Sequence, residues 1–165
     1  MNINSAINHG SKILNDNFIY NSLLDSEILM AETINKDRSY ILLNSNKNLN
    51  KTDLNKFKFL IKQRSLGKPI AYLTKSKFFW NSEFFITSAT LIPRPDTELI
   101  VENALNVVKH KNKINILDIG VGSGCILLSI LKERLDFFGT GIDISAKCLN
   151  ISKINAAKLN LSSRL

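Results

Sequence analysis

The sequence predicts an α/β protein in which a small helical domain precedes the first part of a doubly wound parallel-sheet domain. Three observations predict this class. Apolar residues before about residue 68 recur at helical spacing. An apolar run at 114–119 leads into three glycines at alternate positions and then a second apolar run, as in a strand, a turn and a helix start. Another apolar run begins at Phe137 and ends in an acid, Asp143, as expected for the next strand.

Residues 1–75 are predicted to form the helical domain. Apolar positions predict helices that begin near residues 6 and 27, a short element at 38–43, and a longer helix for which Thr52 offers an N-cap. Gly67 then ends that helix. Because so small a bundle offers no deep cleft, we expect it to hold a macromolecular substrate. The alternative is a purely structural appendage.

Residues 76–95 are predicted to form a hairpin and a linker. Two aromatic-rich runs, 77–80 and 83–87, flank the polar pair Asn81-Ser82, and this arrangement predicts a hairpin turn. The same aromatic residues would also serve as a hydrophobic joint between the two halves of the chain.

A stiff segment leads into the third predicted domain, residues 96–165. Two prolines around an arginine fix an extended backbone, and Asp96 is the expected cap of a helix that runs to about residue 108. A rigid helix start with several polar groups could line a site, and the alternative is simply a well-capped helix. The candidate site-lining residues are Arg94, Asp96, Thr97 and Glu98.

The glycine turn after the run at 114–119 has the properties of a ligand-binding loop. Glycine tolerates positive φ and has no Cβ, so the backbone passes close to a ligand, and the following helix presents free N–H groups. A dinucleotide fingerprint needs the pattern G-x-G-x-x-G, but its third glycine would fall at Cys125. A dehydrogenase is therefore disfavoured. The turn instead follows Asp118, a carboxylate suited to a cationic ligand.

A second carboxylate, Asp143, ends the next strand nineteen residues after Gly124. An acid at this place in a doubly wound sheet accepts hydrogen bonds from ribose hydroxyls. The turn resembles motif I of the S-adenosylmethionine methyltransferases, which implies S-adenosylmethionine as the cofactor. The candidate cofactor-binding residues are Asp118, Gly120, Val121, Gly122, Ser123, Gly124 and Asp143. No residue is assigned a catalytic role, and no metal site is expected.

The composition favours an ordinary globular protein of the cytoplasm. The chain has 165 residues, a 44% apolar fraction and no apolar run long enough to span a membrane. Its start lacks the features of a signal peptide, and its two isolated cysteines make a disulfide or zinc framework unlikely. The net charge of +8 comes from scattered lysines without interleaved aromatic residues, so direct nucleic-acid binding is not expected.

Several segments, in order along the chain, resemble the HemK/PrmC family of protein-glutamine methyltransferases. The most specific is 92–98 (IPRPDTE), and the others are 67–74, 78–80, 117–124 and Asp143. The resemblance implies a Rossmann-like, S-adenosylmethionine-dependent methyltransferase domain behind the helical one. It implies methylation of the side-chain amide of the glutamine in the Gly-Gly-Gln loop of bacterial peptide chain release factors, with the helical domain docking this partner.

Two features depart from the family pattern. Lys75 stands where the family usually has a glycine, and the Asn-Pro-Pro-Tyr motif with which the family holds its substrate amide does not occur. We therefore expect an N-terminal fragment, truncated after the second strand of the Rossmann-like domain and the helix that follows, and inactive alone. The alternatives are a nucleic-acid amino-methyltransferase and a partner-binding remnant without turnover.

Overall fold

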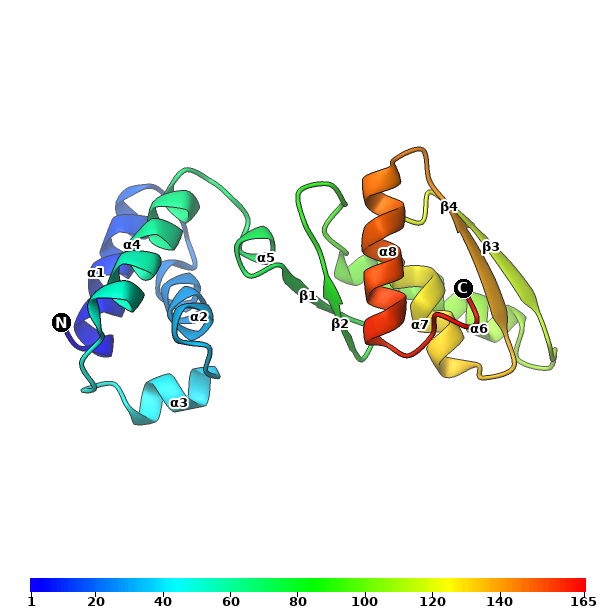
Figure 1. The fold of residues 1–165 in the computed structure, drawn as a ribbon, viewed down its shortest axis with the longest axis horizontal. Helices are drawn as coiled ribbons and strands as arrows, with labels where there is room; N and C mark the ends of the chain where they lie inside the picture. Colours follow the sequence, from blue (N-terminus) through cyan, green and yellow to red (C-terminus); the bar gives the residue numbers. More distant parts are fainter. The chain divides into compact units, whose positions relative to one another are not determined.

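The computed structural model describes residues 1–165 and divides them into two units, Met1–Thr74 and Lys75–Leu165. The first unit is helical, and the second combines helices with two sheets of two strands each (Figure 1). The predicted α/β class with a helical N-terminal part is therefore confirmed. No helix of the chain combines the length and the apolarity that a membrane crossing requires.

Five helices make up the first unit: α1 (Ile3–Asp16), α2 (Ser22–Ile34), α3 (Arg38–Leu43), α4 (Lys51–Ser65) and α5 (Ile70–Leu73). Polar caps fix where three of them begin. Asn2, Asp37 and Asn50 have extended backbone, and each side chain accepts a hydrogen bond from the backbone N–H three residues later. The predicted cap at Thr52 is wrong, because α4 already begins at Lys51 and Thr52 lies inside its first turn.

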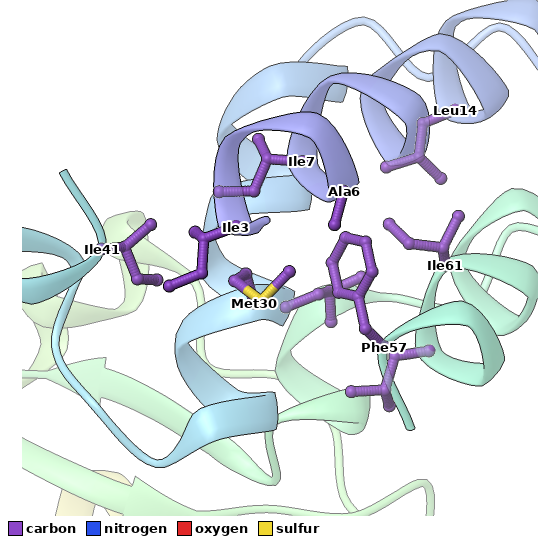
Figure 2. Close-up of a cluster of buried hydrophobic side chains, with 10 residues drawn as sticks. Ile3, Ala6, Ile7, Leu14, Met30, Ile41, Phe57 and Ile61 are labelled. Atoms are coloured by element: carbon purple, nitrogen blue, oxygen red, sulfur yellow. The ribbon is translucent and has the colours of Figure 1, made fainter. Parts of the chain in front are cut away.

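An apolar core joins the helices of the first unit (Figure 2). Ala6 of α1 and Phe57 and Ile61 of α4 contribute to it, and their exposed fractions do not exceed 2%. Gly10 of α1 allows close approach of the helices, because a Cβ there would lie 2.7 Å from Oγ of Ser26 in α2. The buried core residues are Ile3, Ala6, Ile7, Leu14, Leu29, Met30, Ile41, Phe57, Leu60 and Ile61.

Two buried acids of α2 are paired with arginines. Oδ2 of Asp25 lies 2.7 Å from Nε of Arg64 in α4, and both side chains are largely buried. Oε2 of Glu27 lies 2.7 Å from Nε of Arg38 at the start of α3. Because a buried charge without a partner is strongly destabilising, these pairs tie α2 to its neighbours.

The second unit begins with an antiparallel hairpin, β1 (Ser76–Phe79) and β2 (Ser82–Phe85). Phe79 pairs with Ser82, so the turn is Trp80-Asn81, one residue earlier than the predicted Asn81-Ser82. Trp80 and Asn81 have φ of +42° and +53°, the backbone that the commonest two-residue hairpin turn requires. The hairpin itself is confirmed, with a turn that sequence alone placed wrongly.

Parallel strands β3 (Asn115–Ile119) and β4 (Phe138–Ile142) form the second sheet, with Asn115 opposite Phe138 and Ile119 opposite Ile142. The helices of this unit are α6 (Glu98–Val107), α7 (Cys125–Glu133) and α8 (Ala146–Lys158), and a short 3₁₀ turn, η1 (Pro95–Thr97), precedes α6. The order of β3, α7, β4 and α8 is the strand–helix alternation that the sequence predicted.

The two faces of the β3–β4 sheet have different surroundings. On one face Gly139 is buried, and a Cβ there would lie 2.7 Å from Leu127 of α7. On the other face Leu117, Ile119 and Phe138 are 59%, 76% and 50% exposed. Figure 1 shows the helices of this unit to one side of the two strands. Parallel sheets normally have both faces covered, but no other part of this chain covers this apolar face.

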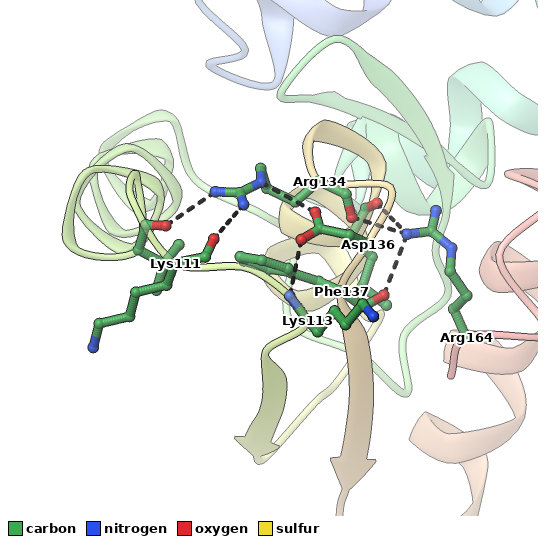
Figure 3. Close-up of polar contacts among 8 residues, drawn as sticks. Lys111, Lys113, Arg134, Asp136, Phe137 and Arg164 are labelled. Atoms are coloured by element: carbon green, nitrogen blue, oxygen red, sulfur yellow. Dashed lines mark hydrogen bonds and ion pairs between the residues drawn. The ribbon is translucent and has the colours of Figure 1, made fainter.

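An arginine near the end of the chain fastens the last turn of α7 (Figure 3). Nη1 of Arg164 donates to three carbonyl oxygens, those of Leu131, Arg134 and Phe137, at 2.8, 3.0 and 3.3 Å. The last carbonyls of a helix have no partner within the helix, and a cation there is favourable. The Arg164 carbonyl also accepts from the Gly139 N–H at 2.8 Å, so this segment contacts β4 as well.

Candidate functional site

The predicted glycine turn links β3 to α7 at the carboxyl end of the parallel sheet. Gly120, Gly122 and Gly124 have φ of +86°, +55° and +81°, a backbone that residues with a side chain rarely adopt. The N–H groups of Gly120 and Val121 both donate to the carbonyl of Ile142, at 2.8 and 3.0 Å. The start of the turn is therefore anchored to the end of β4.

The three glycines of the turn have different surroundings. A Cβ on Gly120 would meet no atom within 4 Å, and a Cβ on Gly122 would meet only the Gly120 carbonyl oxygen at 3.8 Å. A Cβ on Gly124 would lie 2.9 Å from Leu128 and 3.2 Å from Ser152. The first two glycines thus border open space that a ligand can approach, whereas the third is required by packing against α7 and α8.

Asp143 lies one residue past β4, and its side chain is hydrogen-bonded to the same turn. Its Oδ2 accepts from the Gly122 N–H at 3.0 Å, and its Oδ1 accepts from the Ser145 N–H at 2.8 Å. These two backbone hydrogen bonds, led by that from Ser145, hold the pKa of the Asp143 carboxyl below its usual range. The carboxylate is therefore a stable anion, and each oxygen keeps a further lone pair for a ligand.

Asp118 stands in β3 opposite Gly141, on the half-buried face of the sheet. Burial raises the pKa of its carboxyl, and the negative charge of Asp143 adds to the rise, while a backbone hydrogen bond from Leu127 opposes it. The two acids that the sequence placed at the ends of neighbouring strands are therefore close enough to interact. A cationic ligand between them would favour the charged form of Asp118.

Two further predicted cofactor-binding residues, Val121 and Ser123, have buried side chains. Val121 is 5% exposed and covers Gly141, where a Cβ would lie 2.7 Å from Cγ2 of the valine. Ser123 is 3% exposed. Since both side chains point into the protein, only the backbone of these two residues is available to a ligand.

The segment 94–98 differs from the prediction in how its helix begins. Asp96 is not the cap of α6, because the chain first makes the 3₁₀ turn η1; Thr97 stands at the cap position without a side-chain hydrogen bond. Oε1 of Glu98 accepts from the Trp80 N–H at 3.0 Å, so this acid supports the hairpin turn. Arg94 and Asp96 are exposed at the surface, and their role in lining a site stays a prediction.

A residue that the sequence did not single out, Asn155 of α8, contacts the turn from inside. It is fully buried, and its Nδ2 donates to the Ser123 carbonyl at 2.8 Å and to the Phe85 carbonyl at 2.9 Å. Its Oδ1 accepts from the Phe85 N–H at 2.7 Å. The only feature of the sequence that could have indicated this role is that Asn155 stands beside the apolar positions of the last helix.

The arrangement is suited to binding a ligand with a cationic centre and hydroxyl groups. It offers an open glycine backbone, the stable anion of Asp143 and the half-buried carboxyl of Asp118. It offers no histidine, and no group of three or more His, Cys, Asp or Glu side chains that could hold a metal ion occurs in residues 1–165.

Comparisons with known proteins place both units among the same relatives. Residues 5–74 match the family described as the PrmC N-terminal domain. The release factor glutamine methyltransferase of Buchnera aphidicola subsp. Acyrthosiphon pisum is 41% identical over 140 residues, which are 85% of this chain and 50% of that protein. The protein of the same name from Buchnera aphidicola subsp. Schizaphis graminum is 39% identical over 161 residues, 98% of this chain and 58% of its own length.

A bacterium of another genus has a relative of the same name. The release factor glutamine methyltransferase of Leptospira interrogans is 41% identical over 137 residues, 82% of this chain and 48% of that protein. The chain therefore spans about half the length of the curated relatives it matches.

Proposed function

Because this chain belongs to the PrmC family, we propose that it forms the docking unit and the cofactor-binding part of an S-adenosylmethionine-dependent methyltransferase. One observation carries the proposal. An open glycine turn lies between two carboxylates, Asp118 and Asp143, at the ends of adjacent parallel strands. In open α/β sheets this is the edge at which ligands bind.

The residues of the turn fit S-adenosylmethionine. Gly120 and Gly122 leave room for a nucleoside against the backbone, as the open space at their Cβ positions indicates. Asp143 would accept hydrogen bonds from the ribose hydroxyls, and Asp118 would offer a negative charge to the cationic part of the cofactor. When bound, the cofactor supplies an activated methyl group. The residues of this chain bind and orient it, and none is assigned to the transfer itself.

We further propose that the methyl acceptor is the side-chain amide nitrogen of a release factor glutamine, as the names of the relatives suggest. Such a nitrogen is a weak nucleophile because its lone pair is delocalised into the carbonyl. Catalysis then rests on alignment of the amide with the methyl group and on hydrogen bonds to the amide protons. These groups would come from a part of the protein that the relatives possess beyond the region matched here.

The helical unit has a surface suited to docking that substrate. A groove of about 420 Å³ between α1 and α4 has an apolar floor that includes Ala6 and Phe57, and the exposed Lys58 and Lys62 lie at its rim. An acidic, amphipathic segment of the release factor fits this combination of apolar floor and basic rim. The double variant Lys58→Glu/Lys62→Glu should weaken release factor binding, whereas Lys51→Glu, outside the groove, should not.

The open face of the β3–β4 sheet supports the proposal that this chain does not transfer methyl groups alone. Leu117, Ile119 and Phe138 expose apolar surface that a further polypeptide would cover. The relatives are about twice as long as the region they share with this chain. A covering segment would also provide the second wall of the cofactor crevice.

A methyl-transfer assay tests the proposed function. The chain alone and a chimera, in which the chain is continued by the unmatched part of the Buchnera aphidicola subsp. Acyrthosiphon pisum relative, are incubated with a release factor and S-adenosylmethionine. Mass spectrometry should find a methyl group on the glutamine with the chimera and none with the chain alone. Transfer only to RNA or DNA would favour a nucleic-acid methyltransferase, and binding without transfer by the chimera would favour a non-catalytic role.

A further inference from the structure

We infer that Asn155 is a positioning residue that holds the glycine turn in its cofactor-binding conformation and couples it to the β1–β2 hairpin. The inference rests on the proposed function, because it concerns the same cofactor site. It assigns a role to a buried side chain that is hydrogen-bonded to the backbone of the turn.

Both polar atoms of the Asn155 side chain are hydrogen-bonded, to the turn and to the hairpin. Its exposed fraction is 0%, and its three hydrogen bonds all go to backbone groups. With Phe85 it exchanges one donor and one acceptor bond, as a neighbouring strand would. These bonds also fix which atom of the amide is oxygen, because only Oδ1 can accept from the Phe85 N–H.

The third bond reaches the centre of the glycine turn. Nδ2 of Asn155 donates to the carbonyl of Ser123, which lies between Gly122 and Gly124. On its other side the turn is held by Asp143, which accepts from the Gly122 N–H. The turn is therefore held by a neutral donor, the Asn155 amide, and by an anion, the Asp143 carboxylate, while a Cβ at Gly120 would meet no atom within 4 Å.

If Asn155 were only a core residue, its substitution would affect the turn no more than substitution of another buried polar residue on α8. Ser152, one turn earlier on α8, is also buried, but its hydroxyl donates to the Leu149 carbonyl of its own helix. It supplies no hydrogen bond to the turn. Ser152→Ala is therefore a matched control: it removes a buried hydrogen bond from the same helix without releasing the Ser123 carbonyl.

The experiment compares the full chain with its Asn155→Asp variant, which keeps the shape of the side chain but loses both donor hydrogens. Amide hydrogen exchange is measured for residues 120–124 and for α8, and S-adenosylmethionine is titrated by NMR. We expect exchange of the turn amides to rise at least tenfold, with α8 unchanged, and cofactor affinity to fall at least tenfold. Ser152→Ala should change neither quantity more than twofold.

Equal protection of the turn in Asn155→Asp and the unaltered chain would overturn the inference. If Asn155→Asp does not fold, Asn155→Leu, which keeps the volume and removes all three bonds, replaces it. Failure of both variants to fold would make Asn155 a general core residue and would also overturn the inference. If the unaltered chain does not bind S-adenosylmethionine, the proposed cofactor site fails, while the exchange measurement still decides whether Asn155 holds the turn.

Discussion

Alanine substitutions at two glycines of the same turn should differ in their main effect, one on stability and the other on cofactor binding. Gly120 and Gly124 have nearly the same φ, +86° and +81°, so the backbone strain of an alanine is nearly equal at both. Their surroundings differ, because a Cβ on Gly120 meets nothing within 4 Å, whereas a Cβ on Gly124 lies 2.9 Å from Leu128. We therefore expect Gly124→Ala to reduce stability and Gly120→Ala to reduce cofactor binding.

The magnitudes follow from separate terms. An alanine at positive φ costs about 1–2 kcal/mol, and the loss of glycine freedom in the unfolded chain offsets about 0.4–1 kcal/mol of this. Gly120→Ala should thus lower the free energy of unfolding by about 1 kcal/mol. Gly124→Ala adds overpacking against α7 and α8, which costs about 1–3 kcal/mol, and should lower it by about 3 kcal/mol in total.

Urea unfolding of the two variants and the unaltered chain measures the stability term, and NMR titration with S-adenosylmethionine measures affinity. We expect Gly120→Ala to weaken binding at least tenfold, because its methyl group occupies the open space before the turn. The reasoning is refuted if Gly120→Ala destabilises the protein as much as Gly124→Ala does. It is also refuted if Gly120→Ala binds the cofactor as tightly as the unaltered chain.

Three further predictions concern side chains around the turn and the sheet. Asp118→Asn should stabilise the protein at pH 7 and weaken cofactor binding. Burial raises the pKa of Asp118, so the folded state disfavours its negative charge. The gain in melting temperature should therefore vanish at pH values below the usual pKa range of aspartate, where the carboxyl is neutral in both states. The pKa of Asp143 is lowered, so the stabilisation from its hydrogen bonds should be lost only as the pH falls through that low value. The rate of hydrogen exchange at the Gly122 amide, measured as a function of pH, tests this, and Asp143→Ala should abolish the protection of that amide. Arg164→Ala removes the hydrogen bonds to the carbonyls of Leu131 in α7 and of Arg134 and Phe137 between α7 and β4. It should lower the free energy of unfolding by about 1–3 kcal/mol in urea, and unchanged stability would contradict this expectation.

The parts of the fold that sequence predicts well are those set by local pattern. The glycine turn follows from the alternate glycines and from the apolar runs on either side, since positive φ and strand–turn–helix order are local properties. Asp118 and Asp143 could be placed together because the carboxyl ends of parallel strands share one edge of the sheet. The short element predicted at 38–43 coincides with α3.

The wrong predictions concern exact positions, the N-cap of α4 and the hairpin turn, for which adjacent residues are almost equally suited. Asn50 and Thr52 are both residue types suited to an N-cap, but the side chain of Asn50 accepts a hydrogen bond from the Asp53 N–H, and the helix therefore starts earlier. The observed hairpin turn lies one residue before the predicted pair, and Glu98, distant in the sequence, accepts a hydrogen bond from the Trp80 N–H of this turn. Such tertiary contacts are not encoded in local spacing.

Asn155 was missed for the same physical reason. Its partner Phe85 lies 70 residues earlier in the chain, and its partner Ser123 lies 32 residues earlier. An asparagine on a helix is usually exposed, and only the assembled unit shows that its amide is buried among backbone groups. Long-range bonds to backbone leave no motif, because any residue can supply the carbonyl or the N–H.

The central claim is that the glycine turn between Asp118 and Asp143 binds S-adenosylmethionine. An NMR titration of the ¹⁵N-labelled chain with this compound tests it most directly, because each amide of the turn reports separately. We predict that chemical-shift changes concentrate at residues 118–124 and at Asp143. The claim is contradicted if no amide of the turn responds at millimolar cofactor, or if the responding amides lie only in the helical unit.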